Sequence, residues 1–377
     1  MAPKSDKITF LLNWRVASPS SPHFNLGGLR RHATPYHAPV FLAQSKGYFA
    51  DEDLKVAILE PTDPSDVTEL IGRGTADMGA KAMVHTIAAA ARGYPVTSIG
   101  TILDEIEVQP FTGVIYLEGG VPGKSEGLTE DFRSLKGKKI GYVGEFGKIQ
   151  IDELTKHYGL KPEDYTAVRC GMDISAAIIE GRVDGGIGID AVQMVELEEW
   201  CKEVGRPATD VKMHRIDQLA ELGCCCFCSI LCIVNDKFLE ENPEKVAGFM
   251  RALKRAADDI QRDPVGSWEA YKAHKKTMRT TLNEKIYERC FTYFSKDLKC
   301  VERDWHKVTN YSRRLGLIDD NFKQNFTNKF VSWEHEPEPS DPLADQERIA
   351  KLQENVRING GVLSSAPAVA AGVTVLA

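Results

Sequence analysis

This chain has 377 residues, of which 47 are basic and 54 acidic, giving a formal net charge of −7. The acidic balance supplies no general reason to expect nucleic acid or an anionic membrane as a partner, and no run approaches the ~20 apolar residues of a membrane span. Because one hydrophobic core rarely serves so long a chain, we expect two lobes.

Two stretches of the chain resemble each other in their elements, and each ends in the pattern Gly-x-x-Asp-x-Gly. The first stretch is predicted to contain, in order, a strand at Lys7–Asn13, a helix at Ala38–Phe49, a strand at Leu54–Glu60, a helix at Ser65–Arg73 and the pattern at Gly74–Gly79. The second is predicted to contain a strand at Lys139–Gly144, helices at Ile149–Tyr158 and Ala176–Glu180, and the pattern at Gly181–Gly186. Strands that alternate with helices indicate parallel sheets, so the repeat predicts two α/β lobes with a cleft between them.

The segment after Asp210 does not fit the second repeat, which is complete by Ile189. We therefore interpret Leu231–Val234 as a strand that returns to the first lobe. The expected domains are 1–112 for the first part of lobe 1, 113–215 for lobe 2, 216–342 for the return to lobe 1 with C-terminal helices, and 343–377 for a tail. The predicted helices are Pro243–Arg262, Ser267–His274, Asn283–Ser295 and Val301–Leu315. The small-residue-rich end, Gly360–Ala377, is expected to be disordered.

The most unusual stretch is Cys224-Cys225-Cys226-Phe227-Cys228, in which four thiols occupy five positions. It reads as part of a buried strand that continues to Val234, on which Cys224, Cys226 and Cys228 share one face. Side chains two apart on that face are roughly 6.6 Å apart, whereas thiolates lie about 2.3 Å from a shared ion. At most one neighbouring pair could then bind an ion directly, unless a bulge bends the strand.

An alternative interpretation makes these cysteines small buried hydrophobes. The chain has nine cysteines in all, an odd number without repeated spacing, and no secretory signal is evident at Met1–Phe10. We therefore expect a cytoplasmic protein with reduced thiols.

Lys81 and His85 lie four residues apart, directly after the first glycine pattern. The alanine-rich run that follows predicts a helix, on which both side chains share one face, about 6 Å apart along the axis. Such pairs are common on solvated helices, but the apolar or small neighbours here disfavour an ordinary solvent face. A partly desolvated lysine is a usable nucleophile for imine formation.

Two further segments could contact a ligand. Gly144-Glu145-Phe146-Gly147-Lys148 joins a strand to a helix, and such a turn either is simply tight or presents backbone N–H groups to a phosphate. Asn13-Trp14 ends the first strand, where the indole could stack on a flat ligand or pack in the core. Together with Lys81, the turn points to a phosphorylated aldehyde.

Several motifs resemble one known family, the fungal thiamine-pyrimidine synthases. The matching segments are Ile8–Trp14, Thr34-Pro-Tyr-His37, Glu60-Pro-Thr62, Gly79–His85, Gly141–Gln150 and Cys224–Cys228. The resemblance covers most of the chain from Lys7 to about Pro342. It implies an α/β, two-lobed, periplasmic-binding-protein-like (type II) fold with a helical C-terminal portion.

The same resemblance implies the chemistry. The family makes 4-amino-5-hydroxymethyl-2-methylpyrimidine phosphate for thiamine biosynthesis from pyridoxal phosphate and its own histidine, in a single turnover that uses iron and oxygen. Lys81 would hold pyridoxal phosphate as an imine, and His85 would be consumed. Gly144 to Gly147 would bind phosphate, and the cysteines Cys224, Cys225, Cys226 and Cys228 would be required for activity, with iron at Cys224, Cys226 and Cys228 if ligation is direct. A homodimer is implied as well.

The chain departs from the family pattern at Arg15–Ala33, because family members run almost directly from the Asn-Trp pair into Thr-Pro-Tyr-His. The extra segment, rich in Ser, Pro, Gly and Arg, resembles translated non-coding sequence more than an evolved lid, so His23 and His32 are not read as ligands. Two rival functions stay open. One is a non-catalytic cleft receptor for a small anionic or pyrimidine-like ligand, and the other is a multiple-turnover pyridoxal-phosphate enzyme.

Overall fold

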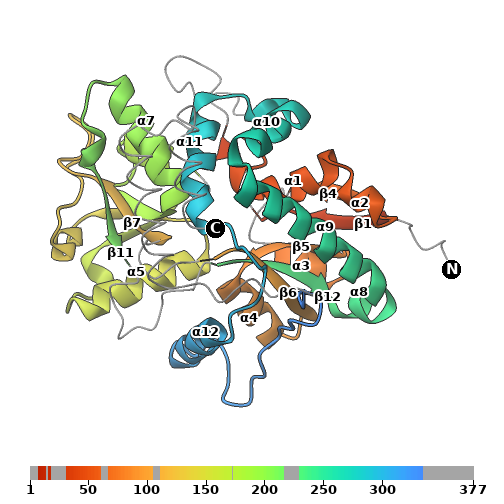
Figure 1. Ribbon diagram of the computed structural model, residues 1–377. Helices are drawn as coiled ribbons and strands as arrows, with labels where there is room; N and C mark the ends of the chain where they lie inside the picture. The colour runs from red at the N-terminus through yellow and green to blue at the C-terminus, as the bar shows by residue number, and fades with distance from the viewer. Residues whose placement is uncertain are drawn as a thin grey trace. The chain divides into compact units, whose positions relative to one another are not determined.

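The computed structural model describes residues 7–13, 16–17, 31–60, 67–104, 111–171, 173–215 and 229–333. The chain divides into two compact units. Unit 1 combines Met1–Asp104 with Ser229–Ala377, and unit 2 is Glu105–Cys228. Each unit has one five-stranded sheet, and Figure 1 shows these sheets with their covering helices.

The sheet of unit 1 is mixed. Its strand order is β4 (Lys55–Leu59), β1 (Lys7–Leu11), β5 (Met78–Ala82), β12 (Ile230–Asn235) and β6 (Val96–Leu103). The first three strands are parallel, and β12 runs antiparallel to both of its neighbours. Green β12 lies beside orange β5 and β6 in Figure 1, although about 130 residues separate β6 from β12 in the sequence. The returning segment Leu231–Val234 is thus a central strand of unit 1.

The sheet of unit 2 has the same topology. Its strand order is β9 (Thr166–Arg169), β8 (Lys139–Tyr142), β10 (Gly185–Ile189), β7 (Thr112–Leu117) and β11 (Val211–Arg215). Again the first three strands are parallel and the last two pairings antiparallel. The prediction of parallel sheets is therefore wrong for one strand of each unit, β12 in unit 1 and β7 in unit 2, which makes two antiparallel pairings in each sheet. Strands β7 and β12 are reached from the other unit, and only a helical crossover within one sheet enforces the parallel direction.

The repeated glycine pattern performs the same structural task in both units. Helix α3 (Val67–Gly72) is followed by Gly74 with φ +72°, and α6 (Ile174–Ile179) is followed by Gly181 with φ +71°. A residue with a Cβ atom is strained in this left-handed conformation, so glycine lets the chain turn from the helix into the next strand.

The aspartate of the pattern anchors that strand to its parallel neighbour. Asp77 Oδ2 accepts hydrogen bonds from the backbone N–H and the hydroxyl of Thr9, both at 2.7 Å. Asp184 accepts one from the N–H of Lys139 at 2.9 Å. The last glycine allows close approach of the strands, because a Cβ on Gly79 would lie 2.4 Å from the carbonyl oxygen of Leu11.

Helices after residue 235 complete unit 1. They are α8 (Asp236–Glu241), α9 (Pro243–Arg262), α10 (Pro264–His274), α11 (Thr281–Cys290) and α12 (Glu302–Arg314), so the expected helical C-terminal portion is present. Helix α9 buries Val246, Phe249, Leu253 and Ala257 at helical spacing, and it packs on α1 (Ala38–Ser45) and α2 (Tyr48–Asp51). Its apolar face thus closes the core over the first strands.

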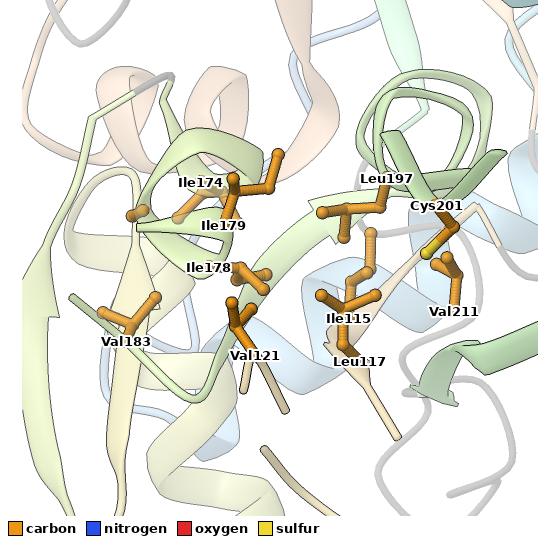
Figure 2. Close-up of a cluster of buried hydrophobic side chains, with 11 residues drawn as sticks. Ile115, Leu117, Val121, Ile174, Ile178, Ile179, Val183, Leu197, Cys201 and Val211 are labelled. Atoms are coloured by element: carbon orange, nitrogen blue, oxygen red, sulfur yellow. The ribbon is translucent and has the colours of Figure 1, made fainter. Parts of the chain in front are cut away.

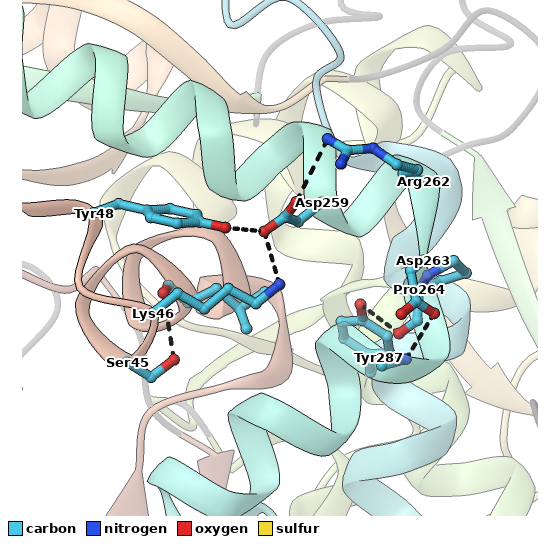
Figure 3. Close-up of polar contacts among 10 residues, drawn as sticks. Ser45, Lys46, Tyr48, Asp259, Arg262, Asp263, Pro264 and Tyr287 are labelled. Atoms are coloured by element: carbon cyan, nitrogen blue, oxygen red, sulfur yellow. Dashed lines mark hydrogen bonds and ion pairs between the residues drawn. The ribbon is translucent and has the colours of Figure 1, made fainter. Parts of the chain in front are cut away.

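A polar junction joins the end of α9 to the loop between α1 and α2. Figure 3 shows Lys46, Tyr48 and Arg262 directed at Asp259. The Lys46 ammonium lies 2.7 Å from Asp259 Oδ2 and the Arg262 guanidinium 3.5 Å from Oδ1, while the Tyr48 hydroxyl donates to Oδ2. These contacts hold the pKa of Asp259 below its usual range despite the opposing effect of burial.

The core of unit 2 lies between its sheet and helices α6 and α7 (Val195–Glu203). Figure 2 shows the cluster, in which Ile115 and Leu117 of β7 meet Ile178 of α6 and Leu197 of α7. Two-residue strands β2 (Val16–Ala17) and β3 (Arg31–His32) pair with each other within the extra segment. Within the described ranges, no helix is long and apolar enough to span a bilayer.

Candidate functional site

Lys81 lies on strand β5 and not on a helix as predicted. Residues 78–82 are held extended because β5 pairs with β1 on one side and with β12 on the other, where Lys81 is opposite Leu231. Helix α4 (Met83–Ala91) begins only after Ala82. Lys81 is 4% exposed, so the residue is largely shielded from water, a setting in which a lysine can act as a nucleophile.

His85 lies in the first turn of α4. The predicted arrangement of Lys81 and His85 one turn apart on one helix is therefore wrong, but the two groups still interact. Burial among protein atoms lowers the pKa of His85 well below its usual range, and the positive charges of Lys81 and Arg92 lower it further. The imidazole is consequently neutral at physiological pH and sits within the electrostatic reach of the lysine.

Asn13 follows β1 at the carboxyl edge of the same sheet and is 6% exposed. Its Oδ1 accepts hydrogen bonds from His37 Nε2 at 2.9 Å and from the Tyr36 hydroxyl at 3.4 Å. The backbone N–H of Thr34 donates to His37 Nδ1 at 3.2 Å. We refer to Asn13, Thr34, Tyr36 and His37 as the amide network.

Sequence reasoning missed the part played by Tyr36 and His37. Both belong to the Thr34-Pro-Tyr-His37 motif, which the resemblance included without a role. The motif forms the short 3-10 helix η1 (Pro35–His37), whose N-cap Thr34 accepts from the N–H of Tyr36. The sequence feature that could have indicated this role is a histidine directly after the Thr34-Pro-Tyr turn. Its hydrogen-bond partner Asn13, however, is 24 residues away in sequence.

The register of the sheet brings Asn13 and Lys81 to one level. Leu11 of β1 pairs with Gly79 of the parallel strand β5. Asn13 follows the last residue of β1 by two positions, and Lys81 lies two positions after Gly79 on β5, so both residues are near the carboxyl edge of these two strands. An amide and an amine therefore line the carboxyl edge of adjacent parallel strands, where ligands of open α/β sheets commonly bind.

In unit 2, Gly144 is the N-cap of helix α5 (Glu145–His157), with φ −144° and ψ −176°. The helix starts four residues before the predicted Ile149, so Glu145, Phe146 and Gly147 form its first turn. Phe146 is buried. The first turn of a 13-residue helix is a favourable place for an anion because the helix dipole is positive there, although the N–H of Gly147 already donates to the carbonyl oxygen of Gly144 at 3.0 Å.

Several predicted site residues lie outside the described ranges. They are Trp14 and the run Cys224, Cys225, Cys226 and Cys228, together with the tail Gly360–Ala377. Among the residues that the structure does describe, no group of three or more His, Cys, Asp or Glu side chains could hold a metal ion. The iron site, with Cys224, Cys226 and Cys228 as ligands, stays a prediction.

Comparison with known proteins identifies the chain's relatives. The family model described as "NMT1/THI5 like" matches residues 34–267. The 4-amino-5-hydroxymethyl-2-methylpyrimidine phosphate synthase of Aspergillus parasiticus is 60% identical over 357 residues, which are 95% of this chain and 96% of that protein. The synthase of the same name from Uromyces fabae is 58% identical over 97% of this chain and 99% of its own. THI5 of Saccharomyces cerevisiae, also so named, is 56% identical over 94% and 97%.

Solved structures share the fold at low identity. The alkanesulfonate-binding protein SsuA from Xanthomonas axonopodis, bound to MOPS, has a TM-score of 0.59 and 13% identity over 85% of this chain and 96% of that one. The Candida albicans CA3427 gene product, described as exhibiting the generic periplasmic binding protein structural fold, has a TM-score of 0.58 and 12% identity over 88% and 98%. The expected periplasmic-binding-protein-like fold is confirmed. With a family model over most of its length and full-length relatives above 50% identity, the chain belongs to the NMT1/THI5-like family, that of the fungal pyrimidine phosphate synthases.

Proposed function

We propose that this protein is a 4-amino-5-hydroxymethyl-2-methylpyrimidine phosphate synthase of thiamine biosynthesis that takes its atoms from pyridoxal phosphate and from its own His85. The names of its relatives support the product, at 52–60% identity over nearly the whole chain. The pairing of a buried lysine with a neutral histidine supports the two sources. Because the histidine is consumed, each polypeptide would turn over once.

The single observation that carries the proposal is the buried amine of Lys81 within the electrostatic reach of His85. Pyridoxal phosphate is a substrate here, and its aldehyde carbon would be attacked by the Lys81 nitrogen with loss of one water. Low exposure of Lys81 excludes competing water from that nitrogen. The neutral imidazole of His85 keeps a ring nitrogen lone pair, which protonation would remove.

The remaining parts of the substrate would meet groups already described. Asn13 would contact the ring of the substrate from the strand next to Lys81. The first turn of α5, at Gly144 to Gly147, would bind the phosphate through backbone N–H groups. Trp14 would stack on the ring, as expected from the sequence. These assignments follow from residue chemistry and from the family resemblance.

Iron and oxygen are proposed as further reactants. Bound iron would supply the redox chemistry that opens the histidine ring, and thiolates are suitable ligands for it. We propose Cys224, Cys226 and Cys228 as the iron-binding set, with Cys225 also required for activity. We further propose that the protein works in the cytoplasm as a homodimer.

The test begins with pyridoxal phosphate and the purified protein. We expect an absorbance change and, after borohydride reduction, a covalent adduct on Lys81 by peptide mass spectrometry. Lys81→Met should abolish the adduct, whereas Lys212→Met, which removes a strand lysine of β11, should leave it intact. A ligand that binds without any adduct would contradict the proposal and favour the receptor.

A second measurement separates self-consumption from repeated turnover. The protein with pyridoxal phosphate is exposed to ferrous iron and oxygen, and the mass of the peptide containing His85 is followed. We expect that peptide to lose imidazole atoms in proportion to pyrimidine phosphate formed, while His37 in the same digest stays intact. More than one product per chain with His85 unchanged would indicate an ordinary pyridoxal-phosphate enzyme.

A further inference from the structure

The amide network fixes which end of the Asn13 side chain faces the ligand. A backbone N–H can only donate, so the bond from Thr34 makes His37 Nδ1 an acceptor. The proton of the neutral ring must then be on Nε2, which lies 2.9 Å from Asn13. A donor at that position requires an acceptor opposite, and the Asn13 atom there is therefore Oδ1 and not Nδ2.

Tyr36 acts on the same oxygen. Its hydroxyl donates to Asn13 Oδ1 at 3.4 Å, a longer bond than that from His37. The carboxamide oxygen is thus occupied by two donors. In the described part of the chain no acceptor is placed against Asn13 Nδ2, so this group keeps its two hydrogens for a ligand.

The network is set in the core and resists rearrangement. Tyr36, Thr34 and His37 are buried, and the Thr34 carbonyl oxygen accepts from the Tyr271 hydroxyl of α10 at 3.1 Å. Burial, reinforced by the positive charge of Lys275, lowers the pKa of His37 to about 3. The neutral Nε2–H tautomer is therefore retained throughout the physiological range.

From this geometry we propose that His37 and Tyr36 are positioning residues that make Asn13 a donor-only contact, selecting a substrate with a hydrogen-bond acceptor on the ring that carries the aldehyde held at Lys81. The acceptor is an anionic oxygen or an unprotonated ring nitrogen. This inference rests on the proposed function, because it assumes that the aldehyde of the substrate is held at Lys81. The pairing of β1 with β5 brings Asn13 and Lys81 to the same edge of the sheet.

Two substitutions of one residue separate positioning from packing. The amide of His37→Gln can place a donor where Nε2 is and keep the bond to Asn13. The amide of His37→Asn can accept from the Thr34 N–H but is too short to donate to Asn13. Asn13→Asp provides a third variant, which keeps the contacts to His37 and Tyr36 while presenting an acceptor in place of the donor.

The assay measures the dissociation constant of pyridoxal phosphate and the yield of the Lys81 adduct, with circular dichroism as the folding check. Since the loss or inversion of one hydrogen bond typically costs about a factor of ten in affinity, we expect His37→Asn and Asn13→Asp to weaken binding about tenfold or more. His37→Gln should bind within about threefold of the wild type. Equal losses for His37→Gln and His37→Asn, with both variants folded, would overturn the proposal.

Substrate analogues identify the acceptor. The two analogues are pyridoxal phosphate methylated on its ring nitrogen and pyridoxal phosphate without its ring hydroxyl. The loss of affinity caused by His37→Asn should disappear for the analogue that lacks the acceptor of Asn13 and persist for the other. A penalty that persists unchanged for both analogues contradicts the selection of an acceptor on the ring.

One readout needs no ligand. In the substrate-free protein, the 15N shifts of His37 should show protonated Nε2 and unprotonated Nδ1 between pH 5 and 8, and the opposite tautomer would refute the argument. If wild-type protein forms no Lys81 adduct but His37 has the expected tautomer, the proposed function fails while the orientation of Asn13 stands.

Discussion

Removing the carboxylate of Asp77 should loosen the strand that carries Lys81. Asp77 ends the turn before β5, and its Oδ2 accepts two hydrogen bonds of 2.7 Å from Thr9, whose hydroxyl in turn accepts from the N–H of Asp77 at 2.9 Å. Hydrogen bonds to a charged group contribute about 1.5–3 kcal/mol each. Because Asp77 is half-buried and water can replace part of this, we expect Asp77→Ala to lower the free energy of unfolding by about 2–4 kcal/mol.

The repeat supplies a matched control for this variant. Asp184 occupies the equivalent turn in unit 2, where its carboxylate accepts a hydrogen bond of 2.9 Å from the backbone N–H of Lys139 at the exposed surface. Asp184→Ala should therefore cost about 1 kcal/mol. Thr9→Val tests the coupling, because it removes the hydroxyl and keeps the backbone donor.

Urea denaturation followed by circular dichroism gives the stability differences, and hydrogen exchange of the β5 peptide reports the local effect. We expect faster exchange in β5 for Asp77→Ala and a smaller yield of the Lys81 adduct. In a double-mutant cycle, the effects of Asp77→Ala and Thr9→Val should be less than additive. Equal destabilisation by Asp77→Ala and Asp184→Ala, or additive effects with Thr9→Val, would refute this reasoning.

Three other predictions follow from the described contacts. First, burial lowers the pKa of His37 from 6.5 to about 3, so between these pH values the unfolded chain binds a proton that the folded chain does not. The free energy of unfolding should therefore decrease as the pH falls, by at most about 1.4 kcal/mol per pH unit. The slope of urea midpoints against pH should be smaller in His37→Gln than in the wild type. Second, Asp259→Asn should destabilise the chain by about 1–3 kcal/mol and, in ultraviolet titration, move the pKa of Tyr48 from about 12 toward its usual value of 10.0; an unchanged titration would contradict the junction. Third, Gly181→Ala should lower the thermal unfolding midpoint more than Gly205→Ala. Both glycines have positive φ, but an added Cβ would lie 2.5 Å from the side chain of Lys124 at Gly181 and would meet nothing within 4 Å at Gly205. An equal or smaller effect of Gly181→Ala would contradict this steric argument.

Local signals in the sequence identified the elements with strong boundaries. Helix α9 runs from Pro243 to Arg262, as predicted, because proline suits the first helical turn and apolar residues recur at helical spacing. The first turn of α5 has instead the sequence of a loop, since Gly144 and Gly147 are poor helix formers. Tertiary packing overrides that preference.

Pairing between distant segments could not be predicted in the same way. Residues 78–82, Met-Gly-Ala-Lys-Ala, have no β-branched member and favour a helix locally, yet they form β5 because β1 and β12 supply hydrogen-bonding partners on both sides. The choice of Lys81 and His85 as site residues therefore came from their chemistry, while their geometry depended on strands from both ends of unit 1. His37 was missed for the same reason, because its role exists only through Asn13.

Asn13, Lys81 and His85 all belong to unit 1, and the shared topology identifies the residues at the equivalent positions of unit 2. Leu11 pairs with Gly79 in unit 1, and Gly141 pairs with Gly186 in unit 2, so these two pairs occupy equivalent positions in the two sheets. Counting along the chain from them, Lys81 corresponds to Gly188. A Cβ at Gly188 would lie 2.7 Å from the Cδ1 atom of Ile115 and 3.0 Å from the Cβ of Gln193, so a side chain at this position of unit 2 would require its neighbours to shift.

The same correspondence matches Asn13 with Val143 and His85 with Val192. Unit 2 therefore has the same strand order but lacks the amide, the amine and the imidazole at these positions. Val143 is instead followed by Gly144, the N-cap of helix α5. At these positions, the groups proposed for covalent capture are therefore present in unit 1 and absent from unit 2. The proposed imine chemistry thus depends on side chains found at these positions in one of the two topologically equivalent sheets, and the shared fold by itself does not supply it.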